Sequence, residues 1–433
     1  MSWESIYKSK LTTANEAVAA IKNNSRLVFG HAAGAPQTIE QALVDNKDNF
    51  SNLEVVHMIN LGGSGYLQAG MEKHFRHNAL FVGGTSREAI EANRADFTPC
   101  FFHEVPRLFK ENYLPVDVAI IHVTRPNADG YCSYGVSCDY TKPAAEVAKM
   151  VIAEANDQMP FVGGDNLIHV SKIDYIVETS NPIFEIPLPK IGETEKAIGE
   201  NCASLIEDGS TLQLGIGAIP DAVLMFLGDK KDLGVHTEMF SDGLIDLIEK
   251  GVVNGSKKTL HKGEMVATFL MGSKRLYDYV NNNDKVKLHP VDYVNHPTVI
   301  MQNEKMISIN SCIEVDLMGQ VVSDSIGTKQ FSGVGGQVDF VRGASMSKGG
   351  KSIIAFPATA SGGKRSRIVP FIAHGAAVTT SRNDVDYIVT EFGVAHLKGK
   401  TLRQRAESLI AIAHPNFRDE LTAECNKRFS TAQ

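Results

Sequence analysis

The chain has 433 residues, 43% of them hydrophobic, and a formal net charge of −7 at pH 7. This length predicts two or three domains with a large core, and the modest acidic excess argues against a nucleic-acid partner, which would need a basic stripe. The sequence contains neither a run near the roughly 18 apolar residues of a membrane span nor a signal-peptide pattern at its start, so we expect a cytoplasmic protein that does not contact a membrane.

Strand and helix patterns alternate through the first half of the chain. Residues 14–22 predict a helix, and residues 25–36 predict a buried strand and a glycine-rich turn that lead into a second helix. The short β-branched run at 116–123 predicts a buried parallel strand. Residues 143–154 predict a further helix.

A proline-rich connector separates the two halves. Residues 181–192 contain three prolines within eight positions, which neither a helix interior nor a central strand accommodates. We therefore predict one domain at residues 1–185 and another at residues 186–433.

The second half continues the same alternation. Residues 193–207 and 402–413 predict helices, and residues 352–356 predict a buried parallel strand. Together the two halves predict an α/β protein with an open sheet in each domain. In such sheets, ligands bind at the carboxyl ends of the strands.

The two halves also resemble each other. The strand and turn at 25–36 parallel those at 210–220, and residues 53–60 parallel 233–240. Three further pairs of blocks follow in the same order, which predicts two homologous domains rather than a solenoid of short repeats. The second copy carries a carboxylate, Glu238, at a position where the first copy has none.

Two glycine-rich turns could bring backbone N–H groups close to a ligand. Gly215 and Gly217 follow a predicted strand but complete no phosphate-binding motif, so a tight strand-to-helix turn explains them more simply. Gly333, Gly335 and Gly336 require unusual backbone torsions or an uncovered backbone, which could stabilise an oxyanion. A surface turn is the alternative for this second run.

Glu238 is the candidate reactive group. It stands at the end of a predicted strand among apolar neighbours, where partial desolvation would make its carboxylate a better nucleophile. A capping or surface role is the alternative for any single glutamate. His236 is expected to pack in the core, because the histidines show no ligand spacing and the cysteines no zinc spacing.

Several blocks together resemble one known family. They lie at residues 213–220, 236–243, 327–340 and 386–399, and Arg403, Arg405 and residues 412–415 continue the pattern. In combination they resemble the acetyl-CoA hydrolase/transferase family, and the resemblance extends over essentially the whole chain. It implies a class I CoA-transferase with two related α/β domains and the active site in the cleft between them.

The resemblance also implies a mechanism and a set of site residues. The family's catalytic glutamate corresponds to Glu238, which would attack an acyl-CoA and form a mixed anhydride and then a glutamyl-CoA thioester, with ping-pong kinetics. Backbone N–H groups near Ile216 and Gly336 are the expected oxyanion donors. No metal and no permanently bound cofactor are expected, since CoA is both substrate and part of the covalent intermediate. The expected contacts with CoA or substrate are Gln213, Gly215, Ile216, Gly217, Ala218, Ile219, Gly333, Gly335 and Gly336.

The expected partners are acyl-CoA and short-chain carboxylates, with CoA moving between 4-hydroxybutyryl-CoA or butyryl-CoA and acetate. We predict that loops 60–66 and 85–87 select the acceptor, with Arg87 as a carboxylate clamp or a structural salt bridge, and that His31 faces the cleft. Two alternatives are an acyl-CoA hydrolase that uses the same Glu238 and a catalytically silent CoA-binding protein. A homodimer is expected by analogy.

Overall fold

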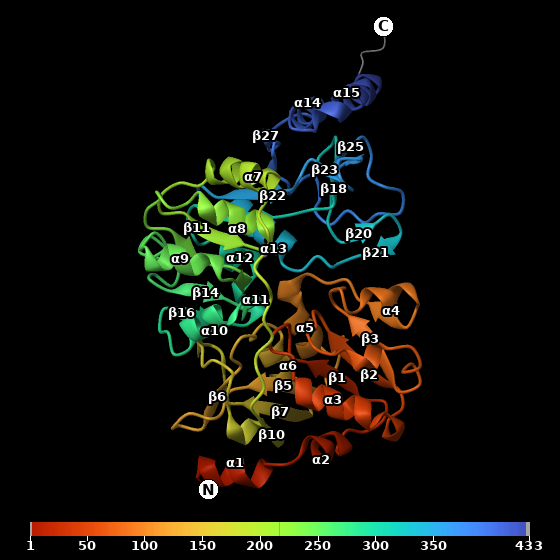
Figure 1. Cartoon of the computed structure of the whole chain (residues 1–433), viewed down its shortest axis with the longest axis vertical. Coiled ribbons are helices and arrows are strands. Elements are labelled where there is room, and N and C mark those ends of the chain that lie inside the picture. Colours follow the sequence, from red (N-terminus) through yellow and green to blue (C-terminus); the bar gives the residue numbers. More distant parts are fainter. Residues whose placement is uncertain (1, 216, 430–433) are drawn as a thin grey trace. The chain divides into compact units, whose positions relative to one another are not determined.

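The computed structural model describes residues 2–215 and 217–429, and the chain divides into two compact units. The N-terminal unit comprises Met1–Pro187, Phe240–Asp242 and Met265–Val294. The C-terminal unit comprises the remaining segments, Leu188–Met239, Gly243–Glu264 and Asn295–Gln433. Each unit is built around one large sheet whose strands are all or mostly parallel (Figure 1).

The N-terminal unit contains a seven-stranded sheet in the order β10-β7-β5-β1-β2-β3-β4, and all neighbouring strands are parallel. Its strands are β1 (Arg26–Phe29), β2 (Leu53–His57), β3 (Phe75–Ala79), β4 (Ala95–Phe97), β5 (Val118–Val123), β7 (Met150–Asn156) and β10 (Tyr175–Thr179). Its helices include α1 (Trp3–Lys10), α2 (Ala14–Ala19), α3 (Gln37–Asp45), α4 (Arg87–Glu91), α5 (Val105–Lys110), α6 (Thr141–Val147), α10 (Lys274–Val280) and α11 (Val291–Val294).

The predicted helix at 143–154 is wrong in its second part. Helix α6 ends at Val147, and residues Met150–Asn156 form β7. The apolar residues of β7 fit either element by periodicity alone, but β7 pairs with β5 and β10 along its two edges, and side chains on both of its faces are buried.

Glu154 of β7 is fully buried and serves as a cap for helix α3. It accepts hydrogen bonds from the backbone N–H of Thr38 at 2.8 Å and from the Thr38 hydroxyl at 3.0 Å. The N-cap residue of α3 is Pro36, which makes no side-chain capping bond. The carboxylate of Glu154 on β7 therefore accepts hydrogen bonds from donors in the first turn of α3, and it fixes the turn that precedes this helix.

The C-terminal unit contains a six-stranded sheet in the order β12-β11-β17-β22-β26-β27, in which only β27 is antiparallel to its neighbour. Its strands are β11 (Thr211–Leu214), β12 (Gly234–Val235), β17 (Met306–Asn310), β22 (Lys351–Ala355), β26 (Tyr387–Thr390) and β27 (Gly393–His396). Its helices are α7 (Glu193–Ala203), α8 (Ala218–Met225), α9 (Gly243–Glu249), α12 (Pro297–Ile300), α13 (Gln337–Met346), α14 (Leu402–Ala411) and α15 (Pro415–Phe429).

The two large sheets share one topology, which confirms the predicted pair of homologous open-sheet α/β domains. In chain order, β1, β2, β5, β7 and β10 correspond to β11, β12, β17, β22 and β26. These strands lie side by side in the order β10-β7-β5-β1-β2 in the first sheet and in the matching order β26-β22-β17-β11-β12 in the second. In both units the first strand leads through a glycine-containing turn into a helix, α3 or α8. The placement of the active site in a cleft between the domains stays a prediction.

Candidate active site

Glu238 lies in a bend between β12 and β13 (Met239–Phe240), at the carboxyl end of β12. Its side chain is half-buried, and both preceding residues are fully covered. The hydroxyl of Thr237 lies 3.2 Å from the carbonyl oxygen of Leu214 and 3.0 Å from that of Met239, within hydrogen-bonding distance of both. The bend that carries Glu238 is thereby tied to the end of the neighbouring strand β11.

The carboxylate of Glu238 has a partner that the sequence did not indicate. The side-chain amide of Asn295 donates a hydrogen bond of 2.6 Å to Oε2 of Glu238. Asn295 is fully buried just before helix α12, so its amide has a fixed position. A short bond to a charged acceptor is stronger than one between neutral groups.

Gly336 lies directly against this carboxylate. A Cβ atom at Gly336 would stand 1.8 Å from Oε2 of Glu238 and 2.3 Å from Nδ2 of Asn295, which no real side chain tolerates. Gly336 is also the N-cap of helix α13. The partial positive charge of a helix N-terminus favours a nearby ionised carboxylate, and this is the nucleophilic form of Glu238.

The rest of the second glycine run shapes the start of α13. Gly333 and Gly335 are buried, and Gly335 has a φ of +53°, a conformation that favours glycine. The run that the sequence singled out is therefore a buried turn, not a surface one. It places Gly336 beside Glu238, although the two residues lie far apart in the chain.

Gln213 and Asn310 form a reciprocal amide pair at the carboxyl ends of β11 and β17. Nε2 of Gln213 lies 3.4 Å from Oδ1 of Asn310, and Nδ2 of Asn310 donates to Oε1 of Gln213 at 3.2 Å. Gln213 is buried, with 3% of its surface exposed. Asn310 was not predicted, because no local pattern distinguishes it from other strand-end asparagines.

The first glycine turn leaves its backbone uncovered. A Cβ atom at Gly215 or Gly217 would meet no described atom within 4 Å, and Gly217 has a φ of +116°. Ala218 and Ile219 begin helix α8 and are half-exposed. Ile216 lies outside the described residues. A ligand can therefore approach the backbone at the start of α8, as anion sites at helix N-termini require.

His31 is held by a buried carboxylate in the N-terminal unit. Its Nδ1 lies 2.9 Å from Oδ2 of Asp139, and the two side chains are 1% and 0% exposed. The ring packs against Phe269, with centroids 4.7 Å apart. The sequence indicated His31 but not Asp139. Arg87, the other predicted residue of this unit, is half-buried at the first position of α4.

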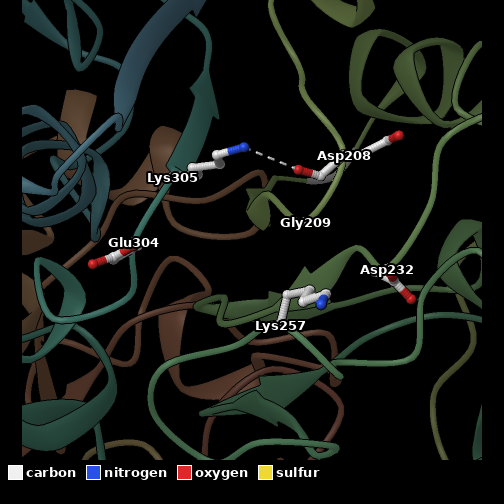
Figure 2. A pocket seen from close by; sticks show the side chains of 6 residues that line it. All are labelled: Asp208, Gly209, Asp232, Lys257, Glu304 and Lys305. Atoms are coloured by element: carbon white, nitrogen blue, oxygen red, sulfur yellow. Dashed lines mark hydrogen bonds between the residues drawn. The ribbon is translucent and has the colours of Figure 1, made fainter.

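A polar pocket of about 310 Å³ opens at the opposite edge of the C-terminal sheet (Figure 2). Five of its six lining residues directly precede β11, β12 or β17, and Lys257 lies between α9 and β14 (Met265–Ala267), whereas Glu238 follows β12. Charged side chains dominate it, and Nζ of Lys305 donates to the backbone oxygen of Asp208 at 3.3 Å. The lining residues are Asp208, Gly209, Asp232, Lys257, Glu304 and Lys305. This pocket is separate from the Glu238 site.

Other features of the described residues concern metals, thiols and membranes. Within residues 2–215 and 217–429, no three histidine, cysteine or acidic side chains are grouped as metal ligands would be.

All six cysteines are free thiols, and burial raises the pKa of Cys312 to about 12. No helix in these same ranges combines the length and apolar character needed to cross a membrane.

The chain matches known proteins over essentially its whole length. Residues 1–186 match the acetyl-CoA hydrolase/transferase N-terminal domain, and residues 272–425 match the C-terminal domain. The chain is 66% identical to 4-hydroxybutyrate coenzyme A transferase of Clostridium kluyveri, over 99% of this chain and 100% of that protein. It is 36% identical to butyryl-CoA:acetate CoA-transferase of Anaerostipes caccae, over 99% and 98% of the two chains. The crystal structure of 4-hydroxybutyrate CoA-transferase from Porphyromonas gingivalis matches with a TM-score of 0.87 and 50% identity, over 99% and 100% of the chains. The chain belongs to the acetyl-CoA hydrolase/transferase family of enzymes.

Proposed function

We propose that this enzyme moves CoA between a short-chain acyl-CoA and acetate, with Glu238 as the nucleophile. The observation that carries the proposal is the setting of the Glu238 carboxylate. It is held by the amide of Asn295, lies against the backbone of Gly336, and stands at the strand edge where α/β sheets bind ligands. The match to a CoA transferase at 66% identity supports CoA transfer as the reaction class.

The reaction proceeds through two covalent intermediates on Glu238. A carboxylate oxygen of Glu238 attacks the thioester carbonyl carbon, the C–S bond breaks, and CoA leaves as a thiolate from a mixed anhydride. The thiolate then attacks the glutamyl carbonyl, which releases the first acid as a carboxylate and leaves a glutamyl-CoA thioester. A second carboxylate takes CoA by the reverse steps, so protons and electrons balance over the cycle.

Asn295 and Gly336 have separate parts in this scheme. The amide of Asn295 orients the attacking carboxylate and then donates to the glutamyl carbonyl oxygen when negative charge develops there. A preorganised donor of this kind is worth about 3 kcal/mol of transition-state stabilisation. The missing side chain at Gly336 leaves room for the tetrahedral carbon that forms at the Glu238 carboxyl group.

The proposal also specifies the acyl group of the donor. The relative with 66% identity is named for 4-hydroxybutyrate, and the butyryl-CoA:acetate relative is 36% identical. We therefore propose 4-hydroxybutyryl-CoA, in preference to butyryl-CoA, as the donor and acetate as the acceptor. The uncovered backbone at Gly215 and Gly217 is the proposed contact for CoA.

Initial-rate kinetics test the proposal. CoA transfer from 4-hydroxybutyryl-CoA to acetate should give parallel double-reciprocal lines, as a ping-pong cycle requires, and Glu238→Gln should abolish transfer while it still binds CoA. CoA release at the same rate with and without acetate would identify a hydrolase instead. Intersecting lines would contradict the covalent cycle.

A further inference from the structure

The glycine-rich run 333–336 of the C-terminal unit is held at its first end by Asp324. The backbone oxygen of Asp324 accepts hydrogen bonds from the backbone N–H groups of Phe331 and Ser332, each at 2.9 Å. Asp324 is itself buried, and its Oδ1 accepts a hydrogen bond of 2.5 Å from the hydroxyl of Thr379. The run therefore begins at a fixed point of the unit.

Gln337 holds the other end of the same run. It directly follows Gly336 and is the first residue of helix α13. Its side-chain amide donates a hydrogen bond of 2.9 Å to the hydroxyl of Ser323 and one of 3.1 Å to the hydroxyl of Thr380. These acceptors lie 14 and 43 positions away in the chain, and Thr380 is fully buried. The start of α13 is thus tied to two distant segments by one side chain.

Both ends of the run are anchored to one small part of the unit. Val321 and Thr380 exchange two backbone hydrogen bonds of 3.1 Å, and the backbone N–H of Ser323 donates to the hydroxyl of Thr379 at 2.8 Å. Val321 begins a strand of a separate three-stranded sheet, which consists of β19 (Val321–Val322), β18 (Glu314–Asp316) and β25 (Ile368–Val369). The two anchors therefore cannot move independently of each other.

The run needs such anchors because its own backbone restrains it little. Three of its four residues are glycines, which have the greatest conformational freedom of any residue. At the same time its position must be exact, since a Cβ atom at Gly336 would stand 1.8 Å from Oε2 of Glu238 and 2.3 Å from Nδ2 of Asn295. A shift of about 1 Å at this point would change the contact with the carboxylate, and a displacement of this size can cost about 10²-fold in rate.

We propose that Gln337 is a positioning residue for CoA transfer, because its side chain fixes Gly336 and the start of α13 against the carboxylate of Glu238. Its effect is indirect, since its amide bonds to Ser323 and Thr380 and acts on the nucleophile through the backbone of Gly336. A glutamine suits this position because one amide donates to both hydroxyls without adding a negative charge near the nucleophile. This inference rests on the proposed function, in which Glu238 attacks the thioester.

Single-turnover kinetics with 4-hydroxybutyryl-CoA test the proposal in Gln337→Met, which keeps the length of the side chain and removes the amide. Formation of the glutamyl-CoA thioester should slow by about tenfold or more, while the half-saturating substrate concentration stays within about threefold of the wild-type value, because a displaced nucleophile slows attack rather than binding. Thr380→Val should lose part of this rate, and Thr380→Ser, which keeps the hydroxyl, should match the wild type. Gln302→Met is the control, since this exposed amide bonds only within its own turn, to the carbonyl of Thr298 at 2.8 Å.

Hydrogen–deuterium exchange gives a second readout that does not depend on the chemistry of Glu238. The backbone amides of residues 331–336 should exchange faster in Gln337→Met than in the wild type, because one end of the run is released. In Gln302→Met and Thr380→Ser they should exchange at the wild-type rate.

Thioester formation in Gln337→Met within about twofold of the wild-type rate, or unchanged exchange of residues 331–336, would overturn the inference. A higher half-saturating concentration at an unchanged rate would also overturn it, since it would show a contact with CoA instead. If Gln337→Met does not fold, Ser323→Ala removes one of the two acceptors and is judged by the same readouts. A wild-type enzyme that forms no thioester on Glu238 would be a failure of the proposed function, and the exchange measurement would then decide whether Gln337 holds the run.

Discussion

The side-chain amide of Asn295 holds Oε2 of Glu238 at 2.6 Å, across 57 positions of the chain. This bond joins a buried, rigid donor to a half-buried carboxylate at a strand end. It fixes the position of Oε2 at the strand end. The Glu238 site is thus an oriented group and not a solvated surface glutamate.

Removal of the Asn295 amide should slow the reaction. Asn295→Ala removes the donor and is expected to lower kcat by about 10²- to 10³-fold, which is the usual effect of losing one oxyanion donor. Asn295→Asp should lower kcat further than Asn295→Ala does, since it places a second carboxylate beside Glu238. Steady-state kinetics with a far-UV circular dichroism check measure both. A kcat within threefold of the wild type for Asn295→Ala would contradict the role given to this amide.

A methyl group at Gly336 should displace the nucleophile. Because its Cβ would stand 1.8 Å from Oε2 of Glu238, Gly336→Ala must move the carboxylate or the start of α13. A misplacement of about 1 Å can cost about 10²-fold in rate. Gly228→Ala is the matched control, since a Cβ there meets no described atom within 4 Å. Equal activity of the two variants would show that the loop adapts freely.

Lys258 should make the C-terminal unit less stable as the pH falls. Burial lowers the pKa of this lysine to about 7, although the Glu264 carboxylate opposes the shift. The unfolded chain, with a pKa of about 10.4, binds the proton between these values, so stability rises with pH from about 7 to 10. Lys258→Met removes this dependence and should stabilise the protein by a few kcal/mol at pH 6, offset by about 1 kcal/mol for the lost bond to the Glu264 carbonyl.

Urea unfolding of the wild type and Lys258→Met at pH 6 and pH 9 checks this prediction. The difference between the two proteins should be large at pH 6 and smaller at pH 9. A difference that does not change with pH would mean that Lys258 stays charged in the folded state.

Asp139 should be important for the stability of the N-terminal unit. It accepts hydrogen bonds from Ser137 at 2.6 Å and from the backbone N–H of Tyr140 at 2.6 Å, and it also contacts His31. Asp139→Ala leaves these buried donors unpaired, so we expect a loss of about 3 kcal/mol or more in the free energy of unfolding. Denaturant titration measures it. A loss below 1 kcal/mol would contradict the account of this network.

The sequence allowed the fold to be predicted because its signals are local. The strand, turn and helix patterns at 25–45 and 210–225 recur in both halves, and the sheets that contain them have the same topology. The exception is the stretch 143–154, where one apolar pattern continues across the end of α6 into β7. Periodicity cannot locate such a boundary, because a strand that is buried on both faces and a buried helix both give a continuous apolar run.

The candidate site could be predicted only in part. Glu238 and Gly336 were indicated by their types and their glycine-rich or apolar surroundings, but their contact depends on the whole C-terminal unit. Asn295, Asn310 and Asp139 carry no local signal, since buried amides and carboxylates become recognisable only through their partners. Long-range polar pairs of this kind are set by tertiary packing.

Intact-protein mass spectrometry tests the central claim most directly. The enzyme is mixed with 4-hydroxybutyryl-CoA in the absence of any acceptor acid, then digested and mapped, with Glu238→Gln treated in parallel. The account predicts one CoA bound as a thioester on the peptide that contains Glu238, no adduct on Glu238→Gln, and faster discharge by acetate than by water. An enzyme that exchanges CoA but forms no adduct, or one on another residue, would contradict it.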